Sequence, residues 1–311
     1  STVPCTASGA SSNLGSLGAV VEEEGELAQD RGEEEPVVVS MLRCFVQDSY
    51  FQSIARERRQ VDEVLSFAED EEGWKEVRNS DGIRVTYRPG IKKGTQMLRM
   101  QGEIEASAVD VVAALYEVDT WSEWVPNLKR SYMVATPDRA RVVMYANIKL
   151  PVVSNRDAVI YGFGVDALEE HGAFVICGQS IESLEGLSFM APNRREDALE
   201  YPPVGKGDVR MSFNMGGFLL SPLGPDKCYL SMLADFDPHL RLIPNWLINW
   251  VGRKIAHLAL KKLRQQVNLI RESELFQERI RANPILYEDV RKRLAAYYDK
   301  KQQRDAERSE G

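Results

Sequence analysis

The sequence predicts an α+β fold in which a long helix closes one strongly curved antiparallel sheet. Apolar residues alternate with period two in a series of short segments between positions 74 and 236, separated by turns rich in Gly, Pro, Asp and Asn. The period then changes, and positions 245–271 predict a long amphipathic helix. With 43% hydrophobic residues in 311, the chain can bury a full core. This order of strands and helices is typical of an α+β domain.

The expected strands fall into two groups with a helix between them. That helix covers positions 108–118, with Ser107 as its N-cap. A later helix begins with Asn283 as N-cap and Pro284 as its first residue. The expected strands are 74–78, 83–88, 98–104, 128–135, 141–150, 157–165, 173–181, 208–218 and 229–236.

The two ends of the chain differ from its centre. Positions 1–36 hold eight acidic residues and one basic residue, so they carry seven of the eight net negative charges and predict a disordered acidic tail. Positions 37–70 predict an N-terminal helical segment, 71–271 the main domain, and 272–311 a charged helical extension.

Composition and motifs argue against several classes of function. Outside the acidic tail the chain is close to neutral, so no nucleic-acid partner is expected. The three histidines have no metal-ligand partner at helical spacing, and there is neither a nucleophile elbow nor a phosphate-binding loop. We therefore expect no enzyme activity, no metal and no cofactor.

The cysteines and the termini bear on the compartment. The four cysteines are scattered without a CxxC pair and are expected to be reduced thiols. No segment reaches the ~18–20 apolar residues that cross a bilayer, and the N-terminus lacks the features of a signal peptide. The chain begins with Ser1, which is compatible with removal of an upstream targeting segment. A cytoplasmic location is expected.

Three motifs together carry a family resemblance. LPVVSNRD at 150–157 ends one strand and opens the next, and WSEWVP at 121–126 follows the first helix of the domain. DFDPHLRLIPNWLINW at 235–250 joins the last strand to the long helix. This combination resembles the START family (steroidogenic-acute-regulatory-related lipid-transfer domains), whose helix-grip fold holds one lipid. The resemblance covers positions 71–271 and implies a protein that binds one lipid and transfers it between membranes.

Two of these motifs allow two interpretations each. Arg156 and Asp157 stand at the mouth of a buried strand, where a charge must be paired or hydrogen-bonded. They either satisfy each other and pin the preceding loop to the sheet, or contact the ligand. Trp121 and Trp124 likewise either anchor the core or face the ligand. The sequence alone leaves both questions open.

One strand predicts where the ligand lies. Ala158, Ile160 and Gly162 give one face of this strand little side-chain volume, which leaves space beneath an amphipathic helix. Glycines equally suit close packing against a helix. With the family resemblance, the residues expected to contact the lipid are Tyr145, Asn147, Arg156, Ala158, Ile160, Gly162, Phe213, Met232, Leu247, Val251 and Ile255.

Departures from the family pattern narrow the range of expected ligands. Many members have a second arginine where this chain has Gly162, and phosphatidylcholine-binding members have an aromatic residue at the position of Ala158. The resemblance therefore implies a phospholipid or sterol-like lipid that is recognised mainly by its apolar shape.

The outer face of the long helix mixes indole rings with bases, which is typical of a membrane-interface surface. The residues expected to dock on a membrane are Trp246, Trp250, Lys254 and Lys261. They predict a transient, peripheral association with membranes. Alternatively, the tryptophans pack under neighbouring loops and the bases are solvated.

Two other functions stay open. The first is a cyclase or aromatase on the same fold, which would need several convergent polar side chains inside the cavity. The second is a non-catalytic scaffold that senses a lipid and acts through its tails. The C-terminal helices could then bind a protein partner.

Overall fold

The computed structural model describes residues 49–185, 200–239, 247 and 251–310. In this part of the chain ten strands form one sheet, in the order β1-β2-β3-β10-β9-β7-β6-β5-β4, with β8 beside β6. Neighbours on the main path are antiparallel, and β8 runs parallel to β6. The strands are β1 Lys75–Ser80, β2 Ile83–Pro89, β3 Gln96–Ile104, β4 Leu128–Asp138, β5 Arg141–Ile148, β6 Arg156–Ala167, β7 Ala173–Ser180, β8 Val209–Arg210, β9 Ser212–Gly224 and β10 Lys227–Asp237.

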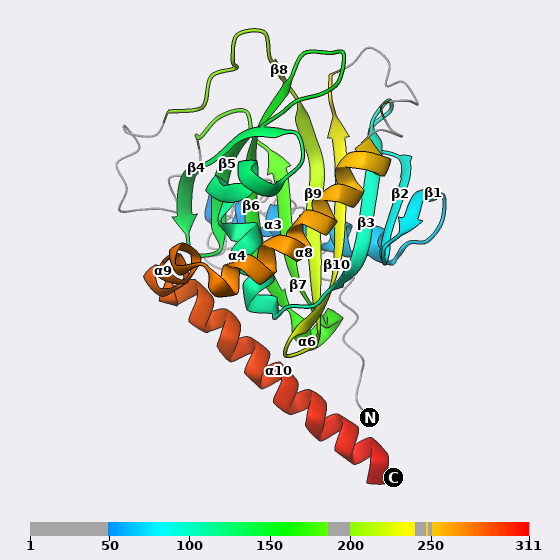
Figure 1. Cartoon of the computed structure of the whole chain (residues 1–311), viewed down its shortest axis with the longest axis vertical. Coiled ribbons are helices and arrows are strands. Elements are labelled where there is room, and N and C mark those ends of the chain that lie inside the picture. Colours follow the sequence, from blue (N-terminus) through cyan, green and yellow to red (C-terminus); the bar gives the residue numbers. More distant parts are fainter. Residues whose placement is uncertain (1–48, 186–199, 240–246, 248–250, 311) are drawn as a thin grey trace, which may run out of the picture.

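Helices cover both faces of this sheet. The face that is in front in Figure 1 carries α4 and α8, whereas α3 lies behind the sheet. The helical elements are α3 Ser49–Glu69, α4 Ala108–Tyr116, η1 Val118–Thr120, α5 Trp121–Trp124, α6 Leu168–His171, the π-helix η4 Val251–Ala256, α8 His257–Glu272, α9 Glu274–Ala282 and α10 Pro284–Glu310. The predicted α+β class, with a sheet covered by a C-terminal helix, is confirmed.

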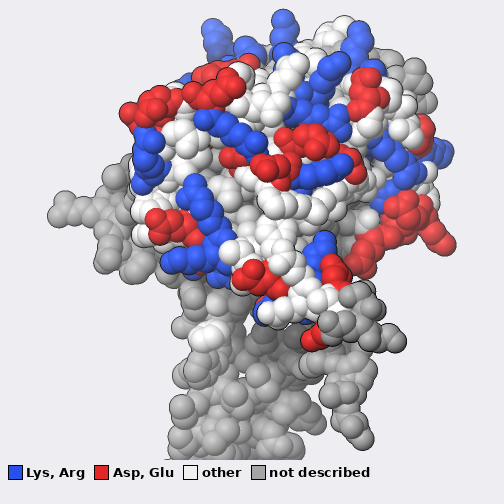
Figure 2. All heavy atoms as spheres, turned by 60° about the horizontal axis from the view of Figure 1, so that its bottom comes forward, with Lys and Arg blue, Asp and Glu red and all other residues white. Residues whose placement is uncertain are grey.

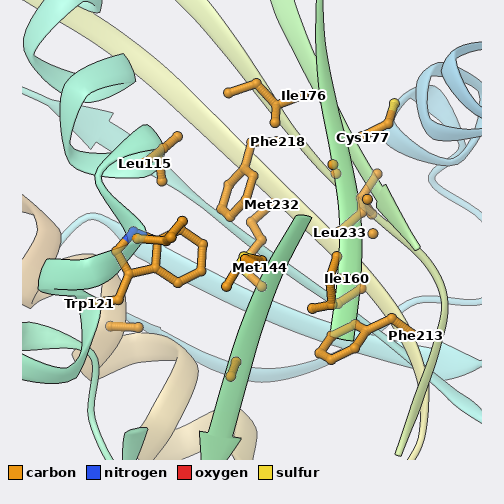
Figure 3. A pocket seen from close by; sticks show the side chains of 18 of the residues that line it. Leu115, Trp121, Met144, Ile160, Ile176, Cys177, Phe213, Phe218, Met232 and Leu233 are labelled. Carbon is orange, nitrogen blue, oxygen red and sulfur yellow. The ribbon is translucent and has the colours of Figure 1, made fainter. Parts of the chain in front are cut away.

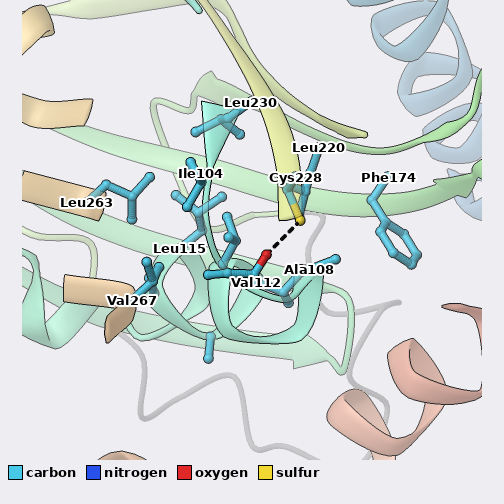
Figure 4. Close-up of a cluster of buried hydrophobic side chains, with 14 of the residues drawn as sticks. Ile104, Ala108, Val112, Leu115, Phe174, Leu220, Cys228, Leu230, Leu263 and Val267 are labelled. Atoms are coloured by element: carbon cyan, nitrogen blue, oxygen red, sulfur yellow. Dashed lines mark hydrogen bonds between the residues drawn. The ribbon is translucent and has the colours of Figure 1, made fainter. Parts of the chain in front are cut away.

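Two hydrophobic clusters follow from the alternation of side chains along the strands. The front cluster packs the sheet against α4, α8, α9 and α10. Figure 4 shows its centre, where Val112 and Leu115 of α4 meet Leu230 of β10. The thiol of Cys228 donates to the carbonyl oxygen of Ala106 at 3.3 Å, which ties β10 to the start of α4. The rear cluster packs α3 on the opposite face, with Val64 fully buried.

The predicted helix starts have the expected caps. The hydroxyl of Ser107 accepts a hydrogen bond from the backbone N–H of Asp110 at 3.2 Å, which satisfies a free donor of the first turn of α4. The side-chain oxygen of Asn283 accepts from the N–H of Leu286 at 3.4 Å at the start of α10. Both predictions are confirmed.

Two elements differ from the prediction. The single strand expected at 208–218 is divided into β8 and the longer β9, because β8 pairs with β6 while β9 pairs with β7 and β10. The long helix contains a π-helix over Val251–Ala256 before α8 begins. The described residues do not include the acidic tail 1–36, positions 37–48, or positions 245–246 and 248–250 of this expected helix.

Candidate ligand cavity

A cavity of about 740 Å³ lies between the front face of the sheet and the helices that cover it. Its lining is mainly apolar, and Figure 3 shows Leu115, Met144, Ile160, Phe218 and Met232 pointing toward one space from a helix and several strands. This volume is within the range of roughly 300–1,000 Å³ that holds small-molecule ligands. The site is therefore a preformed apolar chamber.

The strands β5 and β6 supply one wall through their alternation. Ile160 and Gly162 of β6 line the cavity together with their partners Met144 and Val142 on β5. A Cβ added at Gly164 would meet no atom within 4 Å, so this position faces open space. A Cβ at Gly162 would lie 3.4 Å from both Val142 Cγ2 and Cys177 O. Small residues here thus leave room and also allow close approach of a neighbour.

The long helix contributes a stripe with a spacing of four residues. Leu247, Val251, Ile255, Ala259 and Leu263 all line the cavity. In an α-helix of 3.6 residues per turn, a spacing of four drifts around the helix. The π-helix over Val251–Ala256 has wider turns and spans the step from Val251 to Ile255, where it reduces this drift.

The structure places most of the predicted contact residues at the cavity. Those that line it are Ile160, Gly162, Phe213, Met232, Leu247, Val251 and Ile255. Ala158 is fully buried and lies on the same strand face as Ile160, but it is not part of the lining.

The structure does not place Tyr145 and Asn147 at the cavity. On β5 the even-numbered neighbours Met144 and Ala146 line the cavity, so the odd-numbered residues point to the other face of the sheet. Tyr145 stacks there on Tyr132, with ring centroids 4.9 Å apart. The side-chain amide of Asn147 donates to Asp208 at 2.7 Å. Neither residue contacts the cavity.

Arg156 pins the loop before β6 and does not line the cavity. The guanidinium donates from Nε to the carbonyl oxygen of Pro238 and from Nη1 to that of Ser154, both at 2.5 Å. Its side chain is nearly fully buried, and this burial lowers the pKa of the guanidinium. Of the two interpretations, the structure supports the pinning role; the prediction of direct lipid contact is not supported by this placement.

Asp157 is paired with Arg210 and not with Arg156. Adjacent residues of a strand point to opposite faces, so Arg156 and Asp157 cannot satisfy each other. The carboxylate of Asp157 is fully buried and accepts from Arg210 Nε at 2.9 Å and Nη2 at 3.0 Å. Arg210 also donates to Tyr201 Oη at 2.7 Å. The sequence motif identified the buried charges but missed Arg210, which lies 53 positions further along the chain.

The tryptophan motif is anchored to α4 and also lies at the wall of the cavity. The Nε1–H of Trp121 donates to the carbonyl oxygen of Ala114 at 3.0 Å, which anchors this segment to α4. The rings of Trp121 and Trp124 pack edge to face with centroids 6.3 Å apart. Both residues also line the cavity, and Figure 3 shows Trp121 at its wall.

The predicted docking face is described only in part. Lys254 and Lys261 are exposed, whereas Trp246 and Trp250 lie outside the described residues. On the same helix His257 is buried, with Nε2 3.3 Å from Asp81, and Arg264 donates to backbone carbonyls of the β1–β2 turn. The helix is thus fastened to β1 and β2 by some of its bases and exposes others.

Other chemistry finds little support among the described residues. No group of three or more His, Cys, Asp or Glu side chains in this part of the chain could hold a metal ion. No described helix is long and apolar enough to span a membrane. The charged residues of the lining, Arg139, Asp166, Asp289 and Arg293, lie where α10 meets the ends of β4, β5 and β6.

Known proteins share this architecture. The family model of the START domain matches residues 53–273, so the chain belongs to the START domain family, which binds and transfers lipids. A human StAR-related lipid transfer protein 6 is 23% identical over 191 residues, which cover 61% of this chain and 79% of that protein.

Two solved human structures show the same fold. STARD10 superposes with a TM-score of 0.57 at 20% identity and covers 74% of this chain and 87% of its own. StAR-related lipid transfer protein 5 has a TM-score of 0.57 at 18% identity and covers 71% of this chain and 100% of its own. The resemblance predicted from the three motifs is confirmed.

Proposed function

We propose that this protein binds a single lipid in the cavity beneath α8 and carries it between membranes. The observation that carries the proposal is the apolar chamber of about 740 Å³ in a START domain. A lipid that leaves a bilayer for such a chamber exchanges one apolar environment for another. Exposure of the lipid's apolar surface to water would cost ~25 cal/mol per Å². An apolar chamber avoids this exposure, so the lipid loses little free energy when it leaves the bilayer.

The lining favours recognition by shape over recognition of a head group. Near the middle of the chamber, Gly162 and Ile160 leave β6 without a polar group, and Met144 and Met232 add flexible apolar side chains. Arg156 is committed to backbone carbonyls. We therefore favour a phospholipid or sterol-like ligand that is held by its chains or rings.

We propose that the protein is cytoplasmic and contacts membranes transiently. Lys254 and Lys261 are exposed on the outer side of the helix, where bases are attracted to anionic lipids. Val152, in the loop before β6, is 95% exposed and has a φ of 66°, an unusual conformation for a β-branched residue. An exposed apolar side chain at the end of the cavity-lining strands suits insertion into a membrane surface.

A cavity-filling variant tests the proposal. Gly162→Trp should abolish uptake of fluorescent sterol or pyrene-labelled phosphatidylcholine from vesicles, because the indole would occupy ligand space. Gly162→Ala is the matched control and should retain uptake, since its Cβ meets neighbours at 3.4 Å. Thermal melting checks that both variants fold. Normal uptake by folded Gly162→Trp would place the ligand elsewhere.

The same preparation separates the competing functions. Lipid extracted from the purified protein supports carriage, and a cyclised product in its place supports an enzyme. A stable protein that is purified with an empty cavity supports a scaffold.

A further inference from the structure

The C-terminal extension contributes to the cavity although it lies beyond the segment that matches the family. The match ends at residue 273, whereas Leu286 and Val290 of α10 line the cavity. These two residues are one helical turn apart and so share one face of α10. Figure 1 shows α10 along the lower edge of the domain, next to α4 and α9.

Buried contacts hold this part of α10 in place. Tyr287 is fully buried, packs edge to face on Tyr116 with ring centroids 6.3 Å apart, and donates from its hydroxyl to Glu117 at 3.0 Å. Burial raises the pKa of the Tyr287 hydroxyl, so it stays protonated as a donor. Arg279 of α9 also binds Glu117, at 2.8 Å. The C-terminal end of α4 therefore fixes where Leu286 and Val290 face.

Charged residues surround the cavity where α10 meets the strands. Arg293 bridges Asp166 at the end of β6, at 2.7 Å, and Asp289 on its own helix, at 2.9 Å. Arg139 in the β4–β5 turn lies 3.8 Å from Asp289. The side chain of Arg293 is 42% exposed, and Gly164, which lies on the cavity side of β6, is also exposed. The cavity therefore reaches the protein surface beside α10.

This opening lies at the far end of the cavity from the loop before β6. In the β5–β6 ladder, Ile148 pairs with Arg156 at one end and Arg141 pairs with Phe163 at the other. The loop that carries Val152 joins the first end, and α10 meets the second end. Figure 2 shows the lower side of the domain, where acidic and basic side chains are interspersed without a patch of one sign. Such a surface does not favour an anionic membrane.

We propose that α10 is part of the lipid site: Leu286 and Val290 contact the end of the ligand that lies farthest from the membrane-facing loop, and their volume limits how long a ligand the cavity accepts. This inference rests on the proposed function. It assigns ligand contact to an extension outside the family match, held in place by Glu117 and by the bridges of Arg293.

Photo-cross-linking tests the contact directly. The full-length protein is loaded from vesicles with phosphatidylcholine that carries a diazirine near the end of one acyl chain, irradiated and digested with trypsin. Cleavage gives the peptide 282–291 from α10, 157–194 from β6 and β7, and 60–75 from α3 on the other face of the sheet. We expect label on 282–291 and 157–194, and none on 60–75.

The outcomes separate the two proposals. Label on 157–194 without label on 282–291 would overturn the role of α10 and leave the proposed function intact. Absence of label from both cavity peptides would contradict lipid binding itself.

A pair of variants tests the limit on ligand length. Val290→Phe should reduce uptake of long-chain phosphatidylcholine several-fold and that of a short-chain analogue much less. Ala296→Phe, at an exposed position of the same helix, is the control and should bind both as the wild type does. Equal losses for both chain lengths, or none in a folded Val290→Phe protein, would contradict the inference. If Val290→Phe does not fold, the presence or absence of the cross-link to peptide 282–291 decides whether α10 contacts the ligand.

Discussion

Asp157 has the most demanding electrostatic environment among the residues of the family motif. Its carboxylate is fully buried, and its ion-pair partner is Arg210, which reaches it with two nitrogens. A buried ion pair adds little net stability, because desolvation offsets the attraction. Loss of one partner is costly, however, since the remaining charge is then buried alone.

Arg210→Ala should therefore lower the free energy of unfolding by roughly 3–5 kcal/mol. Urea denaturation measures the change. Arg58→Ala is the control, because Arg58 forms an exposed pair with Asp62, and exposed pairs contribute about 1 kcal/mol or less. A similar small change in both variants would show that Asp157 finds another partner.

The residue types of this motif could be predicted from the sequence, but their partners could not. A charge at the start of a buried strand must be satisfied, which pointed to Arg156 and Asp157. Arg156 donates to the carbonyl oxygen of Pro238, and Asp157 accepts from Arg210. Both partners come from distant segments whose position depends on the folded sheet. Tyr145 and Asn147 lie on the face of β5 away from the cavity, and a shift of one residue along a strand reverses the face.

At the scale of elements, the alternation of apolar residues with a period of two predicted the strands, and capping residues predicted where α4 and α10 begin. The π-helix was not predicted, because apolar spacing alone does not distinguish a π-helical turn inside an amphipathic helix from an α-helical one. The division between β8 and β9 was also missed, since pairing with two different strands determines it.

The outer face of the long helix supports a prediction about docking. Lys254→Glu combined with Lys261→Glu should slow lipid transfer from anionic vesicles, most strongly at low salt, because screening of the exposed charges is then weakest. Transfer between neutral vesicles should change little. A pyrene-phosphatidylcholine transfer assay measures both rates.

The matched control is Lys292→Glu with Lys301→Glu, which makes the same charge change at exposed positions of α10. Equal slowing by both pairs would indicate a general effect of net charge. Normal transfer by the Lys254 and Lys261 variant at low salt would assign docking to another surface, first of all the loop that carries Val152.

At the scale of the whole molecule, buried thiols predict how stability depends on alkaline pH. Burial raises the pKa of Cys177 and of Cys228 to about 12 from an ordinary value of 9.0. Below pH 9 each thiol is protonated in both states and contributes no pH dependence. Between pH 9 and 12 only the unfolded chain releases the proton, so stability falls as pH rises.

Cys177→Ala should make this alkaline loss shallower, by up to about 1.4 kcal/mol per pH unit. Urea denaturation of the reduced protein between pH 8 and 10.5 gives the slope for each protein. The comparison of slopes is independent of the packing cost of the substitution. Parallel slopes for wild type and variant would mean that the Cys177 thiol ionises normally in the folded protein.

The overall fold was predictable because its signals are local: alternating strands, a capped helix and a terminal amphipathic helix. The role of α10 was not, because its charged sequence predicts only an exposed helix. Its cavity-facing residues Leu286 and Val290 become apparent only when α9 folds back and Tyr287 docks beside α4.

Native mass spectrometry tests the central claim most directly. The full-length protein is incubated with vesicles of mixed phospholipid and sterol, separated from them, and weighed intact alongside Gly162→Trp. We predict that the wild type gains the mass of one lipid per chain and that the variant gains none. A wild-type protein that is folded yet remains at the mass of the chain alone would contradict the account.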